Sequence, residues 1–286
     1  MRGAPIDVQP SPPSQPSPAR GEGLEWGSRV CEETFINEVE AYRSLPSTND
    51  LALQRVLEPQ LATPYLILAD EQTAGRGRGA NRWWSGSGAL TFSLILEPVA
   101  LGIPQAAWPR IALTAGLSVC EVLDELAPSA VTLLKWPNDV WLERRKVCGI
   151  LVEVPACPPP LPQRLVVGMG INLNNSLANA PEEIRLRGTS VYDVTQRTIS
   201  VPEFLAKLLR RFAANLAELA ADPASLAERW QAVCALSGKI VTVDQGSQVV
   251  SGRCLGLATD GALLVQTTRG TEPVYSGVVA AITDSL

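Results

Sequence analysis

The hydrophobic and polar positions along this chain predict a mixed α/β fold. Short apolar or alternating runs bounded by turn residues are typical of strands, whereas longer stretches with apolar residues three and four apart are typical of helices. Residues 104–126 form a long, mostly apolar stretch that predicts a single helix lying against the sheet. Helical periodicity also extends from residue 202 to about residue 235, with a break near Asp222-Pro223. The runs before residue 180 that predict strands are residues 35–42, 64–69, 89–96, 131–142 (two strands around a tight turn), 146–153 and 164–174.

The pattern changes after Gly238, where the apolar runs become shorter and alternate more regularly. Turn residues such as Asp244-Gln245-Gly246 and Asp260-Gly261 separate these runs. Several short strands of this kind predict a small antiparallel barrel of SH3-like size, with a domain boundary near Leu236. The expected strands span residues 239–243, 249–257 and 262–267.

The first part of the chain has a different composition, because many prolines stand there among Ser, Gln and Gly. Such a segment buries too little apolar surface to offset the entropy lost on ordering, so it is predicted to be a disordered tail. The expected division is a Pro-rich tail over residues 1–33, an α/β domain over residues 34–235 and a small β domain over residues 236–286.

The composition excludes several functional classes. The 286-residue chain has a formal net charge of −5 and a pI near 5.0, whereas a dedicated nucleic-acid-binding domain normally carries a basic patch. It contains no histidine, so Ser-His-Asp chemistry, Cys-His chemistry and metal sites that need imidazole are excluded. Its six cysteines are scattered without a C-x-x-C pair, which is typical of reduced, buried thiols. No apolar run reaches the length of about 18 residues that a membrane span needs, and the N-terminus lacks the apolar core of a signal peptide.

Residues 72–88 are a candidate ligand loop between two predicted strands. This segment contains five glycines, three arginines and the adjacent pair Trp83-Trp84. Glycines let backbone N–H groups approach a ligand closely, arginines match carboxylate and phosphate oxygens, and tryptophan offers a flat face for stacking. Such a loop is suited to cover a small anionic ligand with a planar part, for example an activated nucleotide. A disordered nucleic-acid-binding arm and a core role for the tryptophans are the alternatives.

Polar residues in otherwise apolar surroundings mark two further places. Ser47 or Thr48 suits the N-cap of a helix that extends to about Leu57, and a helix start also presents backbone N–H groups to a ligand. Lys135 interrupts a predicted buried strand, which is costly unless its amine reaches a partner, and Asn138-Asp139 follow it in a turn. A lysine that extends to the surface and ordinary turn residues are the alternatives here.

Five short motifs in this chain together resemble those of the biotin protein ligases, also called biotin–[acetyl-CoA-carboxylase] ligases. The resemblance covers roughly residues 35–286, and several motifs in one order are far more specific than a single glycine pattern. The motifs are Ser47-Thr48-Asn49, Gly75-Arg76-Gly77-Arg78, Lys135-Trp136-Pro137-Asn138-Asp139, Lys146-Val147-Cys148-Gly149-Ile150-Leu151-Val152-Glu153 and Gly168-Met169-Gly170-Ile171-Asn172.

The resemblance implies a fold and a reaction. The implied fold is α/β (α+β), with a mixed-sheet catalytic domain similar to class II synthetases and a small SH3-like β-barrel after it. In the implied reaction, biotin and ATP form biotinyl-5′-AMP, and a lysine of a biotin carboxyl carrier protein then accepts the biotinyl group. Mg²⁺ is expected to accompany ATP, and no metal site made by the protein alone is expected. A lipoate or octanoyl ligase or transferase of the related fold is the alternative.

The resemblance also implies partners and a location. The acceptor is expected to be the carrier domain of acetyl-CoA carboxylase or of another biotin-dependent carboxylase. The chain looks like the short type without an N-terminal DNA-binding domain, so neither DNA nor a membrane is an expected partner. The expected location is the cytoplasm, and a homodimer stays open beside a monomer.

Individual residues take roles by the same resemblance. Asp139 is expected to position or deprotonate the incoming lysine amine. Ala80 stands where the family loop usually has glycine and Asn81 where arginine is common, which affects the expected closure of the loop. The expected catalytic residues are Arg78, Lys135, Asp139 and Lys146. The expected biotin-binding residues are Ser47, Thr48, Asn49, Gln72, Gly75, Arg76, Gly77, Arg78, Lys146 and Gly149. The expected ATP- or adenylate-binding residues are Arg78, Trp83, Asn138, Lys146 and Asn172.

Overall fold

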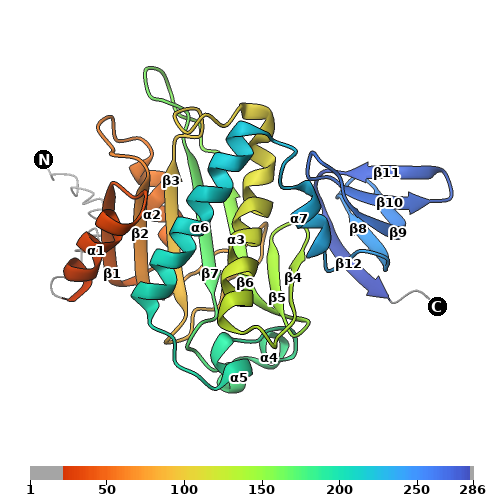
Figure 1. Cartoon of the computed structure of the whole chain (residues 1–286), viewed down its shortest axis with the longest axis horizontal. Coiled ribbons are helices and arrows are strands. Elements are labelled where there is room, and N and C mark those ends of the chain that lie inside the picture. The colour runs from red at the N-terminus through yellow and green to blue at the C-terminus, as the bar shows by residue number, and fades with distance from the viewer. Residues whose placement is uncertain (1–21, 284–286) are drawn as a thin grey trace, which may run out of the picture.

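The protein contains two β-sheets, and most of its helices pack against the larger one (Figure 1). The structure is a computed structural model and describes residues 22–283. The strands of the larger sheet are β1 (Glu38–Leu45), β2 (Tyr65–Gln72), β3 (Leu90–Leu96), β4 (Thr132–Lys135), β5 (Asp139–Leu142), β6 (Arg145–Glu153) and β7 (Leu165–Ile171). Their order across the sheet is β1-β2-β3-β7-β6-β5-β4. The sheet is mixed, as predicted, because β1 and β2 are parallel and the other neighbours are antiparallel.

Helices cover both faces of the larger sheet. Helices α3 (Ile111–Leu126) and α6 (Val201–Ala221) lie side by side on one face and share the main hydrophobic core with it (Figure 1). Helix α2 (Thr48–Arg55) packs on the opposite face against β2, β3 and β7, where a second cluster of buried residues forms. The part of this opposite face over β6 and β7 carries the cavity described below.

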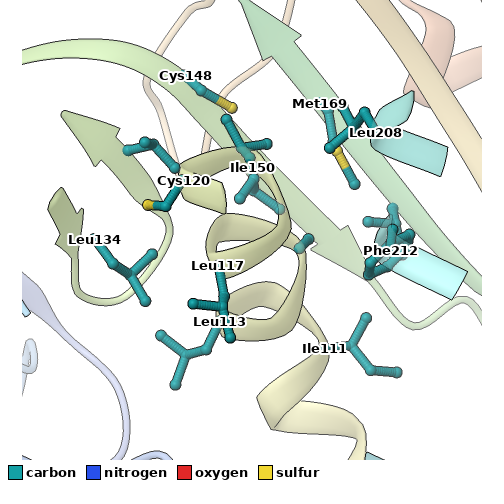
Figure 2. Close-up of a cluster of buried hydrophobic side chains, with 14 of the residues drawn as sticks. Ile111, Leu113, Leu117, Cys120, Leu134, Cys148, Ile150, Met169, Leu208 and Phe212 are labelled. Atoms are coloured by element: carbon teal, nitrogen blue, oxygen red, sulfur yellow. The ribbon is translucent and has the colours of Figure 1, made fainter. Parts of the chain in front are cut away.

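The alternation of side chains along each strand explains how one sheet supports the hydrophobic core on one face and the cavity on the other. On β7, Val167 and Met169 belong to the core beneath α3 and α6, so the intervening Gly168 and Gly170 face the opposite side. Figure 2 shows part of this core, where side chains from α3, α6 and the central strands converge. The strand pattern therefore places apolar side chains on one face of β7 and leaves room on the other face for Asn49 and Trp83 to lie against the glycines.

The segment Gln105–Leu126 is long and apolar enough to cross a membrane by length and composition alone. In this fold 72% of its most apolar 18-residue stretch is buried inside the protein, which is typical of a core helix. It is not a single α-helix, because the 3₁₀ helix η1 (Gln105–Arg110) precedes α3. Pro109 lies in η1 and lacks the N–H that an α-helical turn would use. The prediction of one helix over residues 104–126 is therefore wrong in its first turns.

The smaller sheet has five strands and the SH3-like character that the sequence predicts. Helix α7 (Ala227–Ala232) leads into it, and Gln231 of α7 donates to the Leu255 carbonyl at 3.1 Å and accepts from the Leu257 N–H at 2.7 Å. The last two strands were not predicted, because few of their side chains are both apolar and buried. The strands are β8 (Ile240–Asp244), β9 (Val249–Leu257), β10 (Leu263–Thr267), β11 (Gly270–Val274) and β12 (Val278–Thr283), all antiparallel and in the order β11-β10-β9-β8-β12.

Two segments for which no helix was predicted contain helices. Helix α1 (Glu22–Glu33) makes the prediction of a disordered tail over residues 1–33 wrong in this part, and residues 1–21 lie outside the described residues. A 12-residue helix is marginal alone, but Val30 is only 2% exposed and packs in the main core.

The polar stretch 175–189, for which no element was predicted, contains η2 (Leu177–Asn179) and α4 (Glu182–Arg187), and α5 (Val191–Thr195) follows it. Acidic residues in the first turn of α4 and basic residues in its last turn complement the helix dipole. Charge placement, which apolar periodicity does not report, therefore stabilises this short helix.

Candidate active site

A cavity of about 370 Å³ lies over the larger sheet, on the face opposite α3 and α6. Its walls come from the start of α2, the glycine-rich loop after β2, the turn between β4 and β5, strands β6 and β7, and the start of β12. Small-molecule sites usually enclose about 300–1,000 Å³, so the cavity suits a ligand of that class. Both sheets therefore contribute to one site.

Most of the predicted site residues meet in this cavity. Gly75 and Asn172 are not among its lining residues. Gly75 instead supports the loop, because its carbonyl accepts from the Trp83 N–H at 2.9 Å. The Asn172 side chain donates to the Thr189 carbonyl at 3.0 Å and accepts from Asn175 at 3.1 Å, so it organises the chain after β7. The predicted residues that line the cavity are Ser47, Thr48, Asn49, Gln72, Arg76, Gly77, Arg78, Trp83, Lys135, Asn138, Asp139, Lys146 and Gly149.

The start of α2 forms one end of the cavity. Ser47 is the N-cap, as predicted, and its hydroxyl accepts from the Asp50 N–H at 3.3 Å. The Gln72 amide oxygen accepts from the Thr48 N–H at 2.7 Å and from the Thr48 hydroxyl at 3.1 Å. With that oxygen occupied, the amide nitrogen of Gln72 is the group it presents to a ligand. This end of the cavity is therefore polar, uncharged and preorganised.

Asn49 is fixed at the same end from three sides. Its amide oxygen accepts from Ser93 at 2.5 Å, and its amide nitrogen donates to the Glu153 carboxylate at 2.8 Å. The backbone of Gly168 lies directly beneath it, since an added Cβ there would be 2.0 Å from the Asn49 oxygen. Asn49 is 4% exposed, so it has little room to move away from these neighbours.

The two arginines of the Gly-Arg-Gly-Arg motif differ in their charge environment. Arg76 contacts two carboxylates, because it donates to Glu153 at 2.5 Å and its Nε lies 3.1 Å from Asp50. Hydrogen bonding to Glu153 raises the pKa of Arg76 above its ordinary value. Arg78 donates to a neutral acceptor, the Gly277 carbonyl before β12, at 2.6 Å. Arg76 thus anchors the loop, whereas Arg78 carries a positive charge that an anionic ligand can use.

Lys135, Asp139 and Lys146 form a charged cluster at the other end of the cavity. The Asp139 carboxylate lies 2.5 Å from the Lys146 amine and 3.6 Å from the Lys135 amine. The antiparallel turn between β4 and β5 pairs Lys135 with Asp139, and the neighbouring strand β6 brings Lys146 beside them. One carboxylate therefore holds two amines at the cavity wall, and the cluster keeps a net positive charge.

Aromatic and amide groups complete the wall near this cluster. The Trp83 ring lies on β7, since an added Cβ at Gly170 would be 2.3 Å from it, and the Lys146 amine lies 5.9 Å from its centroid. The Asn138 side chain donates to the Ile150 carbonyl at 2.6 Å and so ties the β4–β5 turn to β6. Only glycine at position 170 allows the indole to approach the sheet this closely.

The cavity concentrates positive charge in an acidic protein. Five basic side chains line it, and Asp139 is the one carboxylate among its lining residues. The whole chain has a formal net charge of −5. A cavity with this excess of fixed cations favours an anionic ligand such as a phosphate or a carboxylate.

Some lining residues were not predicted from the sequence. Arg82 and Asn81 belong to the glycine-rich loop and follow from its position, so the motif pattern already contained a signal for them. Gly168 and Gly170 belong to one of the five motifs, but neither was assigned to the site from the sequence. The residues that the smaller sheet contributes had no local signal at all, and they are Gly277, Val278 and Val279.

Comparison with known families places this site in context. The model of the Biotin/lipoate A/B protein ligase family matches residues 41–172, which contain most of the cavity wall. The model of the biotin protein ligase C-terminal domain matches residues 236–280, which contain the rest. These matches define the class as protein ligases of the biotin and lipoate type.

Individual relatives narrow the class. The biotin–[acetyl-CoA-carboxylase] ligase of Paracoccus denitrificans is 32% identical over 236 residues, which cover 82% of this chain and 96% of the relative. The biotin protein ligase from Aquifex aeolicus in complex with biotin and ATP superimposes with a TM-score of 0.74 at 30% identity, covering 87% of this chain and all of that one. The chain belongs to the biotin protein ligase family.

Other relatives are longer than the matched region. The bifunctional ligase/repressor BirA of Bacillus subtilis is 30% identical over 215 residues, or 74% of this chain. The match spans 64% of that relative's length.

Proposed function

We propose that this chain is a biotin ligase that uses ATP to attach biotin to a lysine of a carrier domain. In the first step, a biotin carboxylate oxygen bonds to the α-phosphorus of ATP and the bond to pyrophosphate breaks, which gives biotinyl-5′-AMP. In the second step, the carrier lysine amine bonds to the biotinyl carbonyl carbon. The bond from that carbon to the AMP oxygen breaks, and the amine loses a proton.

The observation that supports this proposal most directly is the Lys135–Asp139–Lys146 cluster facing an arginine-bearing loop. Bringing a carboxylate against a triphosphate requires cations that offset their repulsion and the charge that develops during transfer. We assign this work to Lys146, Lys135 and Arg78. Asp139, which already binds two amines, is suited to position a third amine and accept its proton in the second step.

The other lining residues divide by chemistry. The polar end formed by Ser47, Thr48, Asn49 and Gln72 suits the uncharged ring system of biotin, with Arg76, Gly77 and Gly149 beside it. The indole of Trp83 and the amide of Asn138 suit the nucleotide base. Gly75 and Asn172 do not line the cavity, so we assign them supporting roles in the loop and in the chain after β7.

ATP would enter this site as its magnesium complex. Across residues 22–283, no group of three Cys, Asp or Glu side chains is placed to hold a metal ion. Phosphate oxygens and water are ordinary ligands of Mg²⁺, and they would supply most of its coordination here.

Exchange of labelled pyrophosphate into ATP tests the first step. We expect exchange that depends on added biotin, and we expect labelled biotin to reach a carrier domain only when ATP is present. Lipoate and octanoate serve as competing acids in parallel reactions, because the family model also includes lipoate ligases. Exchange driven by lipoate and absent with biotin would replace this proposal by the lipoate alternative.

We infer that the acceptor is a carrier domain of a biotin-dependent carboxylase, because two relatives are named as ligases of acetyl-CoA carboxylase. A cytoplasmic location is supported by the six cysteines, all of which are unpaired. We propose neither DNA nor a membrane as a partner, because the composition is acidic. A homodimer and a monomer are both compatible with this proposal. An electrophoretic shift of operator-like DNA at physiological salt would contradict the proposal about DNA.

We place the catalytic domain at residues 34–235 and the C-terminal domain at residues 236–286, which the two family matches support.

Replacing Gly168 by alanine is expected to weaken biotin binding by about tenfold or more. The new methyl group would lie 2.0 Å from the Asn49 amide oxygen, and Asn49 can only relieve this contact by leaving Ser93 and Glu153. Losing one or two hydrogen bonds of about 1–1.5 kcal/mol accounts for this factor. Isothermal titration calorimetry with biotin measures it.

The matched control for this substitution is Gly27→Ala. An added Cβ at Gly27 has only ordinary contacts, with Val39 at 3.7 Å. This variant should bind biotin as the wild type does. Wild-type affinity in a folded Gly168→Ala protein would show that the position of Asn49 does not control binding.

A further inference from the structure

Glu153 joins two walls of the cavity although it does not line the cavity itself. It stands at the end of β6, and its carboxylate accepts from Arg76 of the glycine-rich loop and from Asn49 of α2. The distances are 2.5 Å to Arg76 and 2.8 Å to Asn49. Three segments far apart in the sequence therefore meet at one side chain.

The positive charge of Arg76 is more than offset at this junction, which distinguishes Arg76 from the other cations of the site. Glu153 and Asp50 together place two carboxylates against the Arg76 guanidinium. Two neighbouring carboxylates compensate the charge of the guanidinium, and both oxygens of Glu153 accept from its Nη2 nitrogen and fix its position. Arg76 is therefore poorly suited to neutralise a ligand, but well suited to hold the loop in one place.

Asn49 depends on the same carboxylate for its orientation. An amide has one oxygen and one nitrogen end, and the two ends present opposite hydrogen-bonding character. Ser93 donates to the oxygen end at 2.5 Å, and Glu153 accepts from the nitrogen end at 2.8 Å. Without Glu153 the nitrogen end would keep only the Leu151 carbonyl at 3.4 Å.

We infer that Glu153 is a positioning residue for the biotin end of the cavity, acting through Arg76 and Asn49. This inference rests on the proposed function and extends it to a residue outside the cavity wall. Glu153 should therefore affect the binding of biotin and leave the binding of the nucleotide unchanged. The nucleotide end is formed by Lys135, Asp139 and Lys146, which pair with one another and not with Glu153. Glu153 makes no contact with the reacting atoms, so it is not a catalytic residue.

The chain contains a closely matched control for this residue. Glu121 of α3 also accepts from one asparagine and one arginine, namely Asn215 at 3.0 Å and Arg229. Its side chain is 21% exposed, compared with 26% for Glu153. It lies on the helical side of the sheet and does not line the cavity. Only the partners of Glu153 belong to the site.

The experiment compares Glu153→Ala, Glu153→Gln and Glu121→Ala in biotin-dependent pyrophosphate exchange, together with their melting temperatures. We expect Glu153→Ala to raise the KM for biotin by about tenfold or more, since hydrogen bonds to a charged group are lost. The KM for ATP and kcat should stay at wild-type values. Glu153→Gln keeps one acceptor and should give a smaller rise in the same direction, and it serves as the test if Glu153→Ala does not fold. Glu121→Ala should lower the melting temperature without changing the KM for biotin.

A double-mutant cycle tests the route through Arg76. Glu153 acts partly through this arginine, so Glu153→Ala should raise the KM for biotin by a smaller factor in an Arg76→Ala background than in the wild type. The rise that is left in that background reflects the lost contact with Asn49. Additive effects, an equal rise in the KM for ATP, or the same rise in Glu121→Ala would each overturn the inference while leaving the proposed function intact. A wild-type protein without biotin-dependent exchange would overturn both.

Discussion

Lys146→Ala is expected to slow biotin-dependent pyrophosphate exchange by about a hundredfold to a thousandfold. The Lys146 amine lies 2.5 Å from Asp139 at the cavity wall, where it faces the position proposed for the reacting carboxylate and phosphate. Removing it leaves Lys135 as the one amine near Asp139. The loss acts on charge that develops in the transition state, so it should appear in kcat more than in the KM for biotin.

Stability should change little in this variant. The Lys146 side chain is 36% exposed, and ion pairs with this degree of exposure contribute only about 0–1 kcal/mol. Lys207→Ala is the control, because it removes a lysine that pairs with Glu125 on the helical side of the sheet. Pyrophosphate exchange and thermal unfolding are measured on both variants. Exchange by Lys146→Ala at a rate close to that of Lys207→Ala would rule out the role assigned to the Lys146 amine.

Arg78→Ala is expected to release biotinyl-5′-AMP about ten to a hundred times faster than the wild type. Arg78 has a neutral carbonyl as its hydrogen-bond acceptor, so its charge is available to the phosphate of the intermediate. Charged hydrogen bonds of about 1.5–3 kcal/mol give a factor of this size when they are lost. Dissociation of labelled biotinyl-5′-AMP in a chase experiment measures the rate.

The control for this variant is Arg145→Ala, which removes the same charge from an exposed position on β6 outside the cavity. Its release rate should equal that of the wild type, and both variants should keep the wild-type melting temperature. Retention of the intermediate by Arg78→Ala for as long as the wild type retains it would show that this arginine does not hold the adenylate.

The parts of the site that could be predicted from the sequence depend on local chemistry. Ser47 or Thr48 was expected to cap a helix because hydroxyl groups satisfy free N–H groups at a helix start, and the structure shows that Ser47 is the cap. Lys135 was expected to need a partner because it interrupts an apolar strand, and Asp139 lies 3.6 Å away across a turn. In both cases the partner stands within a few residues, so spacing alone indicates it.

The parts that could not be predicted depend on long-range contacts. Glu153 lies 77 positions from Arg76, and Gly277 lies 199 positions from Arg78. Glu153 ends one of the five motifs, but no local pattern indicates which donors Glu153 or the Gly277 carbonyl would meet. Asn172 shows the opposite case, because a motif suggested a ligand contact while folding directs its amide to Thr189. Helix α1 was missed because its stability comes from packing on β1, which only the folded chain provides.

The part of the cavity wall that β12 contributes means that the protein cannot be cut between its two sheets without opening the cavity. The cavity needs segments that begin at Ser47 and end at Val279, so neither sheet carries a complete site. A cut in the connection near residue 236 would yield two fragments that are each inactive. Gln231 of α7 forms hydrogen bonds with the backbone of Leu255 and Leu257 in the smaller sheet. A cut before α7 would keep these hydrogen bonds within one fragment. Leu226 and Trp230 pack in the main core, so the two fragments would have to rebuild that core before the cavity could form again. The cavity therefore reports whether both parts of the chain are held together.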